Sequence, residues 1–109
     1  MHIKAENIFE LIPDNLAKEI FEPIIQSKDV KVERIISKGH TSPETGWYDQ
    51  EQNEWVLVLK GDAIITFEND NEIRLMEGSY LDIPAHTKHR VSWTSQETET
   101  IWLAIFYSD

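Results

Sequence analysis

The sequence predicts an all-β protein, a sandwich or barrel, built as a single domain from its 109 residues. From Val30 onward, apolar residues recur with the period of two that is typical of strands. The strand-like runs are short, and turn residues such as Gly61-Asp62 and Glu77-Gly78 separate them. No segment after residue 30 has the length and period of a crossover helix, which argues against a parallel α/β sheet.

The N-terminal part, residues 1–29, is expected to be helical and to pack on the barrel formed by residues 30–107. Asp14 or Asn15 can cap a short helix, and Pro23 is expected to end or kink it. This segment is too short to fold alone, so it needs the barrel as a partner.

Seven strands are expected after this segment, each bounded by turn or loop residues. They lie at 30–37, 55–59, 63–67, 73–76, 80–83, 89–93 and 100–107. The strands 55–59 and 100–107 are apolar on both faces, whereas a strand wetted on one face would alternate with polar residues. One face of each should line the barrel, and the other should be covered by the N-terminal helices or by a second subunit. Of these we expect a homodimer.

Composition excludes several classes of partner and site. The formal net charge is -10, so nucleic acids and anionic membrane surfaces are poor partners. Lys88 and Arg90 flank His89, which could make a concave site locally positive. The chain has no cysteine, which excludes disulfides and thiolate ligands and fits a cytoplasmic protein. We expect no signal peptide, because the N-terminus lacks an apolar core, and no membrane helix, because no apolar run approaches about 20 residues.

Two motifs with fixed spacing identify candidate functional residues. Glu54 opens a predicted strand and is separated by six residues from Gly61. Gly78 and Pro84 bracket five residues, and His89 opens the next strand. On each of these strands the alternate residues share the face of Glu54 or His89. A carboxylate and an imidazole meeting inside an apolar barrel suit a divalent first-row metal.

These motifs resemble those of the cupin superfamily over roughly residues 30–107. The resemblance implies an antiparallel β-barrel or jelly roll, also called a double-stranded β-helix. In this family the barrel usually holds a divalent metal through three histidines and a glutamate. The paired histidines of the first motif are missing here. Their places fall on Tyr48 and Gln50, or on Trp47 and Asp49, depending on the spacing used.

Several site chemistries therefore remain open. Gln50, Glu54 and His89 could hold Mn, Fe, Ni or Zn, with waters completing the shell; a set with Asp49 in place of Gln50 is the alternative. In a further alternative, Glu54 and His89 form a hydrogen-bonded pair without a metal. His86 could replace a missing ligand.

The remaining candidate residues surround the presumed mouth of the barrel. They are His40, Trp47, Tyr48, Asp49, His86 and Arg90. The resemblance implies that Trp47, Tyr48 and Gln50 define the pocket where other members have histidines. His40, like His86, is either a loop residue or a substitute ligand.

The sequence thus predicts a barrel that binds a divalent metal and a small polar organic ligand. Such a site could catalyse a metal-dependent reaction, with Tyr48 or His86 as a proton carrier. The alternative is a metal-free binding or sensor module. No catalytic residue beyond these is indicated.

Overall fold

The computed structural model describes residues 3–109, in which the chain forms eight strands and no helix. The strands are β1 (Ile20–Gln26), β2 (Val30–Ser37), β3 (Asn53–Lys60), β4 (Asp62–Phe67), β5 (Glu72–Met76), β6 (Tyr80–Ile83), β7 (His89–Thr94) and β8 (Thr100–Tyr107). The seven expected strands are confirmed as β2–β8, and β1 is additional.

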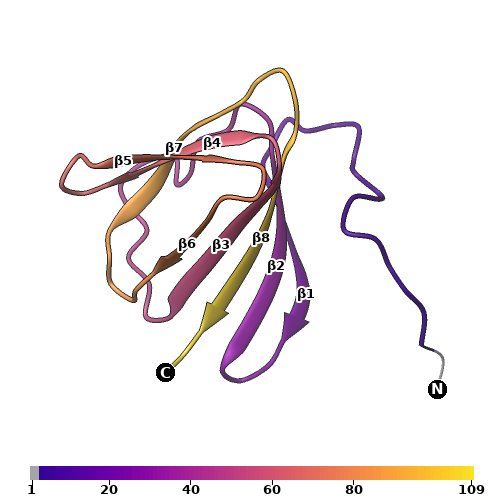
Figure 1. Cartoon of the computed structure of the whole chain (residues 1–109), viewed down its shortest axis with the longest axis horizontal. Coiled ribbons are helices and arrows are strands. Elements are labelled where there is room, and N and C mark those ends of the chain that lie inside the picture. The colour runs from indigo at the N-terminus through magenta and orange to yellow at the C-terminus, as the bar shows by residue number, and fades with distance from the viewer. Residues whose placement is uncertain (1–2) are drawn as a thin grey trace.

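The strands form two antiparallel sheets that face each other (Figure 1). One sheet has five strands in the order β1-β2-β8-β3-β6, and the other has three in the order β5-β4-β7. Strands distant in sequence are neighbours, since β8 lies between β2 and β3. This arrangement confirms the predicted jelly-roll barrel.

The hydrophobic core fills the space between the two sheets. Val56, Val58 and Trp102 enter it from the larger sheet, and Ala63 and Ile65 enter it from the smaller one. Each is no more than 2% exposed. Val56 and Val58 share the face of Glu54, so the register that buries these valines also turns the carboxylate inward.

The prediction of helices near the N-terminus is wrong. The Asn7 and Asn15 side chains accept hydrogen bonds from the backbone N–H groups of residues two positions later, which favours turns over a helix. The buried guanidinium of Arg34 donates to the carbonyl oxygens of Ile8 (3.0 Å) and Glu10 (2.6 Å), among others. Carbonyls that would accept helical hydrogen bonds are therefore engaged by β2.

Residues 20–26, which were also expected to be helical, pair with β2 as an edge strand. Pro23 is tolerated there because a register shift follows it and an edge strand can lack one backbone donor. In Figure 1 the segment before β1 runs beside the β1 side of the barrel.

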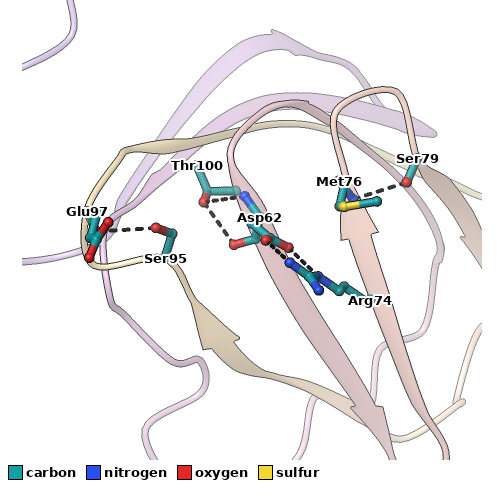
Figure 2. Close-up of polar contacts among 7 residues, drawn as sticks. All are labelled: Asp62, Arg74, Met76, Ser79, Ser95, Glu97 and Thr100. Carbon is teal, nitrogen blue, oxygen red and sulfur yellow. Dashed lines mark hydrogen bonds and ion pairs between the residues drawn. The ribbon is translucent and has the colours of Figure 1, made fainter.

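One end of the barrel is closed by the turn between β3 and β4 and by the start of β8 (Figure 2). The Thr100 hydroxyl accepts a hydrogen bond from the Asp62 N–H and donates one to the Asp62 carbonyl, both at 3.2 Å. Gly61 has φ 101°, and a Cβ there would lie 2.5 Å from Thr100 Oγ1. Arg74 binds the Asp62 carboxylate with two of its nitrogens.

In residues 3–109 no helix is long and apolar enough to cross a membrane.

Candidate functional site

A cavity of about 240 Å³ opens between the sheets at the end opposite the Gly61 turn. Its wall combines apolar residues from both sheets with a small number of polar ones, which is typical of a ligand site. The lining residues are Glu19, Phe21, Lys31, Glu33, Ile35, Ser42, Tyr48, Gln50, Glu54, Val56, Ile65, His89, Val91, Trp102 and Phe106.

Glu54 reaches this cavity because it lies near the start of β3 and on the inward face. Its backbone neighbours are Ile83 of β6 and Phe106 of β8. The residue is only 8% exposed. A buried carboxylate is costly unless it is hydrogen-bonded, so its partners define the site.

His89 is the main partner of Glu54. It opens β7, is 3% exposed, and its backbone pairs with Tyr48 in an isolated bridge. His89 Nδ1 lies 2.7 Å from the Thr87 carbonyl oxygen, and Nε2 lies 3.1 Å from Glu54 Oε1. A carbonyl can only accept, so Nδ1 carries a proton and Nε2 is the nitrogen that is free to change state.

The protonation of His89 depends on competing effects. Burial lowers its pKa, but the hydrogen bond to Glu54, the hydrogen bond to the Thr87 carbonyl and the charge of Glu54 raise it, and the net effect is a raised pKa. The protonated imidazole donates to both oxygens at once. When His89 is protonated, the site holds a proton on Nε2 next to a carboxylate.

Gln50 and Tyr48 complete the polar cluster. Gln50 Nε2 donates to Glu54 Oε1 at 2.8 Å. The Tyr48 ring lies 5.6 Å from the His89 ring, measured between centroids. Burial raises the pKa of Tyr48, a hydrogen bond with Ser42 lowers it, and nearby glutamates raise it further, so the net pKa is raised and the phenol stays a donor at neutral pH.

The two oxygens of Glu54 are used differently. Oε1 accepts from both Gln50 and His89. Within residues 3–109, no hydrogen bond reaches Oε2, although Glu54 lines the cavity. An acceptor is thus left for a molecule that enters the barrel.

Four other candidate residues lie outside the cavity lining. His86 Nδ1 and Asp49 Oδ1 form a contact of 2.8 Å on the surface, where both side chains are well exposed. The guanidinium of Arg90 lies 5.4 Å from the centre of the Trp47 ring, and Arg90 is exposed. The structure brings Tyr48, Gln50, Glu54 and His89 together, and it places these four around them.

His40 lies at the closed end, far from His89. Its backbone carbonyl accepts from the Thr94 hydroxyl at 2.7 Å, and Thr94 is the last residue of β7. Because His89 is the first residue of this strand, about 16 Å of strand separates the two ends.

Sequence reasoning missed three charged residues that line the cavity. Glu19 precedes β1, while Lys31 and Glu33 belong to β2. The sequence of β2 shows two alternating sets of residues. One begins at Val30, and the more polar set consists of Lys31, Glu33, Ile35 and Ser37. Which of the two sets faces the cavity depends on how β2 pairs with β8, and a local sequence pattern does not predict that pairing.

Glu54 and His89 offer two donor groups of the kind that binds divalent first-row metals. His89 Nε2, which has a free lone pair once it is deprotonated, lies 3.1 Å from Glu54 Oε1, and the Thr87 carbonyl fixes the tautomer by accepting from Nδ1. Gln50 could offer its amide oxygen if the amide turned over. No group of three or more His, Cys, Asp or Glu side chains in residues 3–109 is arranged to hold a metal.

Comparison with known proteins supports the fold. The cupin-domain family model matches residues 33–106. A Ralstonia eutropha JMP134 protein named "putative mannose-6-phosphate isomerase" is 42% identical, with 98% of this chain and 100% of that chain covered and a TM-score of 0.91. No curated protein matches the chain.

Two more distant structures share the fold alone. An RmlC-like cupin protein from Desulfovibrio desulfuricans is 21% identical, with 97% of each chain covered and a TM-score of 0.77. A cupin superfamily protein from Desulfitobacterium hafniense DCB-2 is 23% identical, with 90% of this chain and 84% of that chain covered and a TM-score of 0.74.

Proposed function

The chain belongs to the cupin-domain family, and from this premise we propose that its barrel binds a small polar organic molecule at Glu54 and His89. The observation that carries the proposal is the buried Glu54–His89 pair, 3.1 Å apart, on the wall of a cavity of about 240 Å³. The volume lies below the usual range for drug-sized ligands, so a metabolite of few atoms suits it.

The same pair can support acid–base chemistry. His89 can donate the Nε2 proton to a ligand atom, and the Glu54 carboxylate stabilises the imidazolium. The neutral phenol of Tyr48 offers a second donor. The name of the Ralstonia protein suggests sugar isomerisation, a proton-transfer reaction, as the first activity to assay.

A divalent metal is the second candidate, with Mn, Fe, Ni or Zn held by Glu54, His89 and Gln50. When bound, such an ion would act as a Lewis acid on a ligand oxygen. The proton and the metal would compete for the same Nε2 lone pair, so metal affinity should rise with pH. The fixed Nδ1 proton of His89 is the observation that favours this version.

Thermal-shift screening of small polar metabolites tests ligand binding, and elemental analysis tests the metal. We expect hits with the native protein and a loss of about tenfold or more in affinity for Glu54→Gln. His86→Gln removes a surface imidazole outside the cavity and serves as the control. Hits that bind Glu54→Gln as tightly as native protein would refute the assigned site.

Turnover separates an enzyme from a binding module. A hit that is consumed by native protein, but not by His89→Gln, supports proton transfer at this pair. A hit that raises the melting temperature and is never consumed supports the sensor alternative.

We further propose that the protein is a homodimer through the outer face of the larger sheet. Backbone pairing places Trp55 next to Ile105 and Ile105 next to Val32, so an apolar strip crosses β3, β8 and β2. These side chains are only half-buried in one chain. Light scattering should give a dimer, and Ile105→Glu should give a monomer; a monomeric native protein would contradict the proposal.

A further inference from the structure

The cavity lining carries more negative than positive charge. Glu19, Glu33 and Glu54 contribute three carboxylates, and Lys31 and His89 are the cationic or basic side chains among the lining residues. Even with both of them protonated, the described lining keeps an excess of one negative charge. Such a site repels an anionic ligand and attracts a cation.

The basic residues beside His89 do not correct this balance. Lys88 forms an ion pair with Glu68 at 3.3 Å, and the Arg90 guanidinium lies over Trp47. Both lie outside the cavity lining. The locally positive site suggested by their position in the sequence is therefore absent from the described lining.

The cavity wall already holds one cation, the Lys31 ammonium, between an aromatic ring and a carboxylate. The Lys31 ammonium lies 4.6 Å from the centre of the Phe106 ring and 3.6 Å from Glu33 Oε2. An aromatic face combined with a carboxylate is a typical ammonium environment. The Lys31 side chain is 37% exposed, whereas that of Glu33 is 11% exposed. The flexible ammonium can move into solvent, while the buried carboxylate and the ring remain.

Glu54, the β3 partner of Phe106, offers an acceptor of its own. Glu54 is 8% exposed, and within residues 3–109 no hydrogen bond reaches its Oε2. This oxygen can accept from a hydroxyl or amine group of a ligand that also reaches the Phe106 ring. Phe21 and Trp102 add apolar surface along the wall.

We propose that the ligand of this site is a small organic cation, whose ammonium displaces that of Lys31 between Phe106 and Glu33 and whose polar end reaches Glu54. This inference rests on the proposed function and narrows its ligand class. It also predicts that sugar phosphates bind poorly, because the cavity wall has a net negative charge that would repel a phosphate.

Paired ligands that differ only in charge test the proposal. Choline and other small amines are titrated against the full-length protein by calorimetry, each beside its uncharged isostere in which carbon replaces nitrogen. Mannose-6-phosphate provides the anionic arm. We expect at least one amine to bind about tenfold more tightly than its isostere, with affinity falling as salt is added, and no binding of the phosphate.

Two substitutions test the subsite itself. Lys31→Met keeps an apolar stem but removes the competing ammonium, so amine affinity should rise about tenfold. Glu33→Gln removes the carboxylate charge and should lower it about tenfold. Lys88→Met, which removes a lysine with a similar surface ion pair outside the cavity, is the control and should change nothing.

The outcomes separate this inference from the proposed function. If neutral isosteres or anions bind as tightly as the amines, the ligand class is wrong while binding in the barrel stands. If Lys31→Met weakens amine binding or creates no change, the displaced-lysine subsite is wrong. If no amine binds but other metabolites do so through Glu54, the cation is refuted and the proposed function survives.

Discussion

The two ends of the barrel use buried polar groups in opposite ways. At the closed end, Thr100 is fully buried, and its hydroxyl forms hydrogen bonds with the backbone of Asp62. At the open end, Glu54 and His89 bond to each other, to Gln50 and to the Thr87 carbonyl, and Glu54 Oε2 has no partner among residues 3–109. Buried polar groups thus stabilise the closed end, whereas at the open end they leave an acceptor for a ligand.

The difference follows from what each side chain can satisfy alone. A threonine hydroxyl is both donor and acceptor, so one backbone turn can satisfy it. A carboxylate can accept more hydrogen bonds than the donors at a single strand end supply, and its ionised form needs compensating charge. We therefore expect substitutions at the closed end to change stability and substitutions at the open end to change binding.

The largest effect should come from Gly61→Ala at the closed end. Its φ of 101° strains an L-residue, and the new Cβ would lie 2.6 Å from the Thr100 Cα, a backbone atom that cannot turn aside. We expect a loss of about 3 kcal/mol or more in the free energy of unfolding, measured with urea. Gly78→Ala is the matched control, because Gly78 also has a positive φ (86°) but nothing within 4 Å, and it should cost about 1 kcal/mol. Equal losses would contradict the close-approach argument.

Thr100→Val should have the next largest effect. The valine keeps the shape of threonine but leaves the Asp62 N–H without its partner, at a cost of about 2 kcal/mol in the free energy of unfolding. Glu54→Gln, at the open end, should cost less, because the glutamine can still accept from Gln50. If Glu54→Gln were the more destabilising of the two, the contrast between the ends would be wrong.

The two ends should also respond to pH in opposite directions. The raised pKa of His89 means that its contribution to stability is present below its unfolded pKa of about 6.5 and is lost as pH rises through the folded value. The pKa of Asp62 is lowered by its hydrogen bond to Arg74, so its contribution is present above about 3.8 and is lost as pH falls. Urea unfolding of chelator-treated protein between acidic and alkaline pH measures both.

Two variants assign these effects. Glu54→Gln should flatten the loss of stability on the alkaline side, and Arg74→Gln should flatten the loss on the acidic side. A pH profile that neither variant changes would show that other groups dominate it.

The smallest effect should be that of Arg74→Gln at neutral pH. The Arg74 side chain is 62% exposed, so its ion pair with Asp62 is screened by solvent and salt. We expect a loss of less than about 1 kcal/mol in the free energy of unfolding, decreasing further in high salt. A much larger loss would mean that the closed end depends on this exposed pair and not on the Thr100 hydroxyl.

The strand positions and the inward face of β3 could be predicted because both are local properties. Alternation along Glu54, Val56 and Val58 is written in consecutive residues, and the spacing of Gly61 and Gly78 marks the turns. The N-terminal helices were predicted wrongly from an equally local pattern. There the deciding contacts, from Arg34 to the carbonyls of Ile8 and Glu10, span 24 residues or more.

By itself, the sequence determined the all-β class, the positions of seven strands along the chain, and Glu54 and His89 as inward-facing polar residues on two of them. Only the tertiary structure decided that Glu19, Lys31 and Glu33 border the same cavity, that His40 lies at the other end, and that β1 is a strand. The physical reason is the distance along the chain over which each effect acts. Periodicity and turn chemistry act between near neighbours in the sequence. The charge of the cavity depends on residues from several strands, and these come together only when β8 lies between β2 and β3.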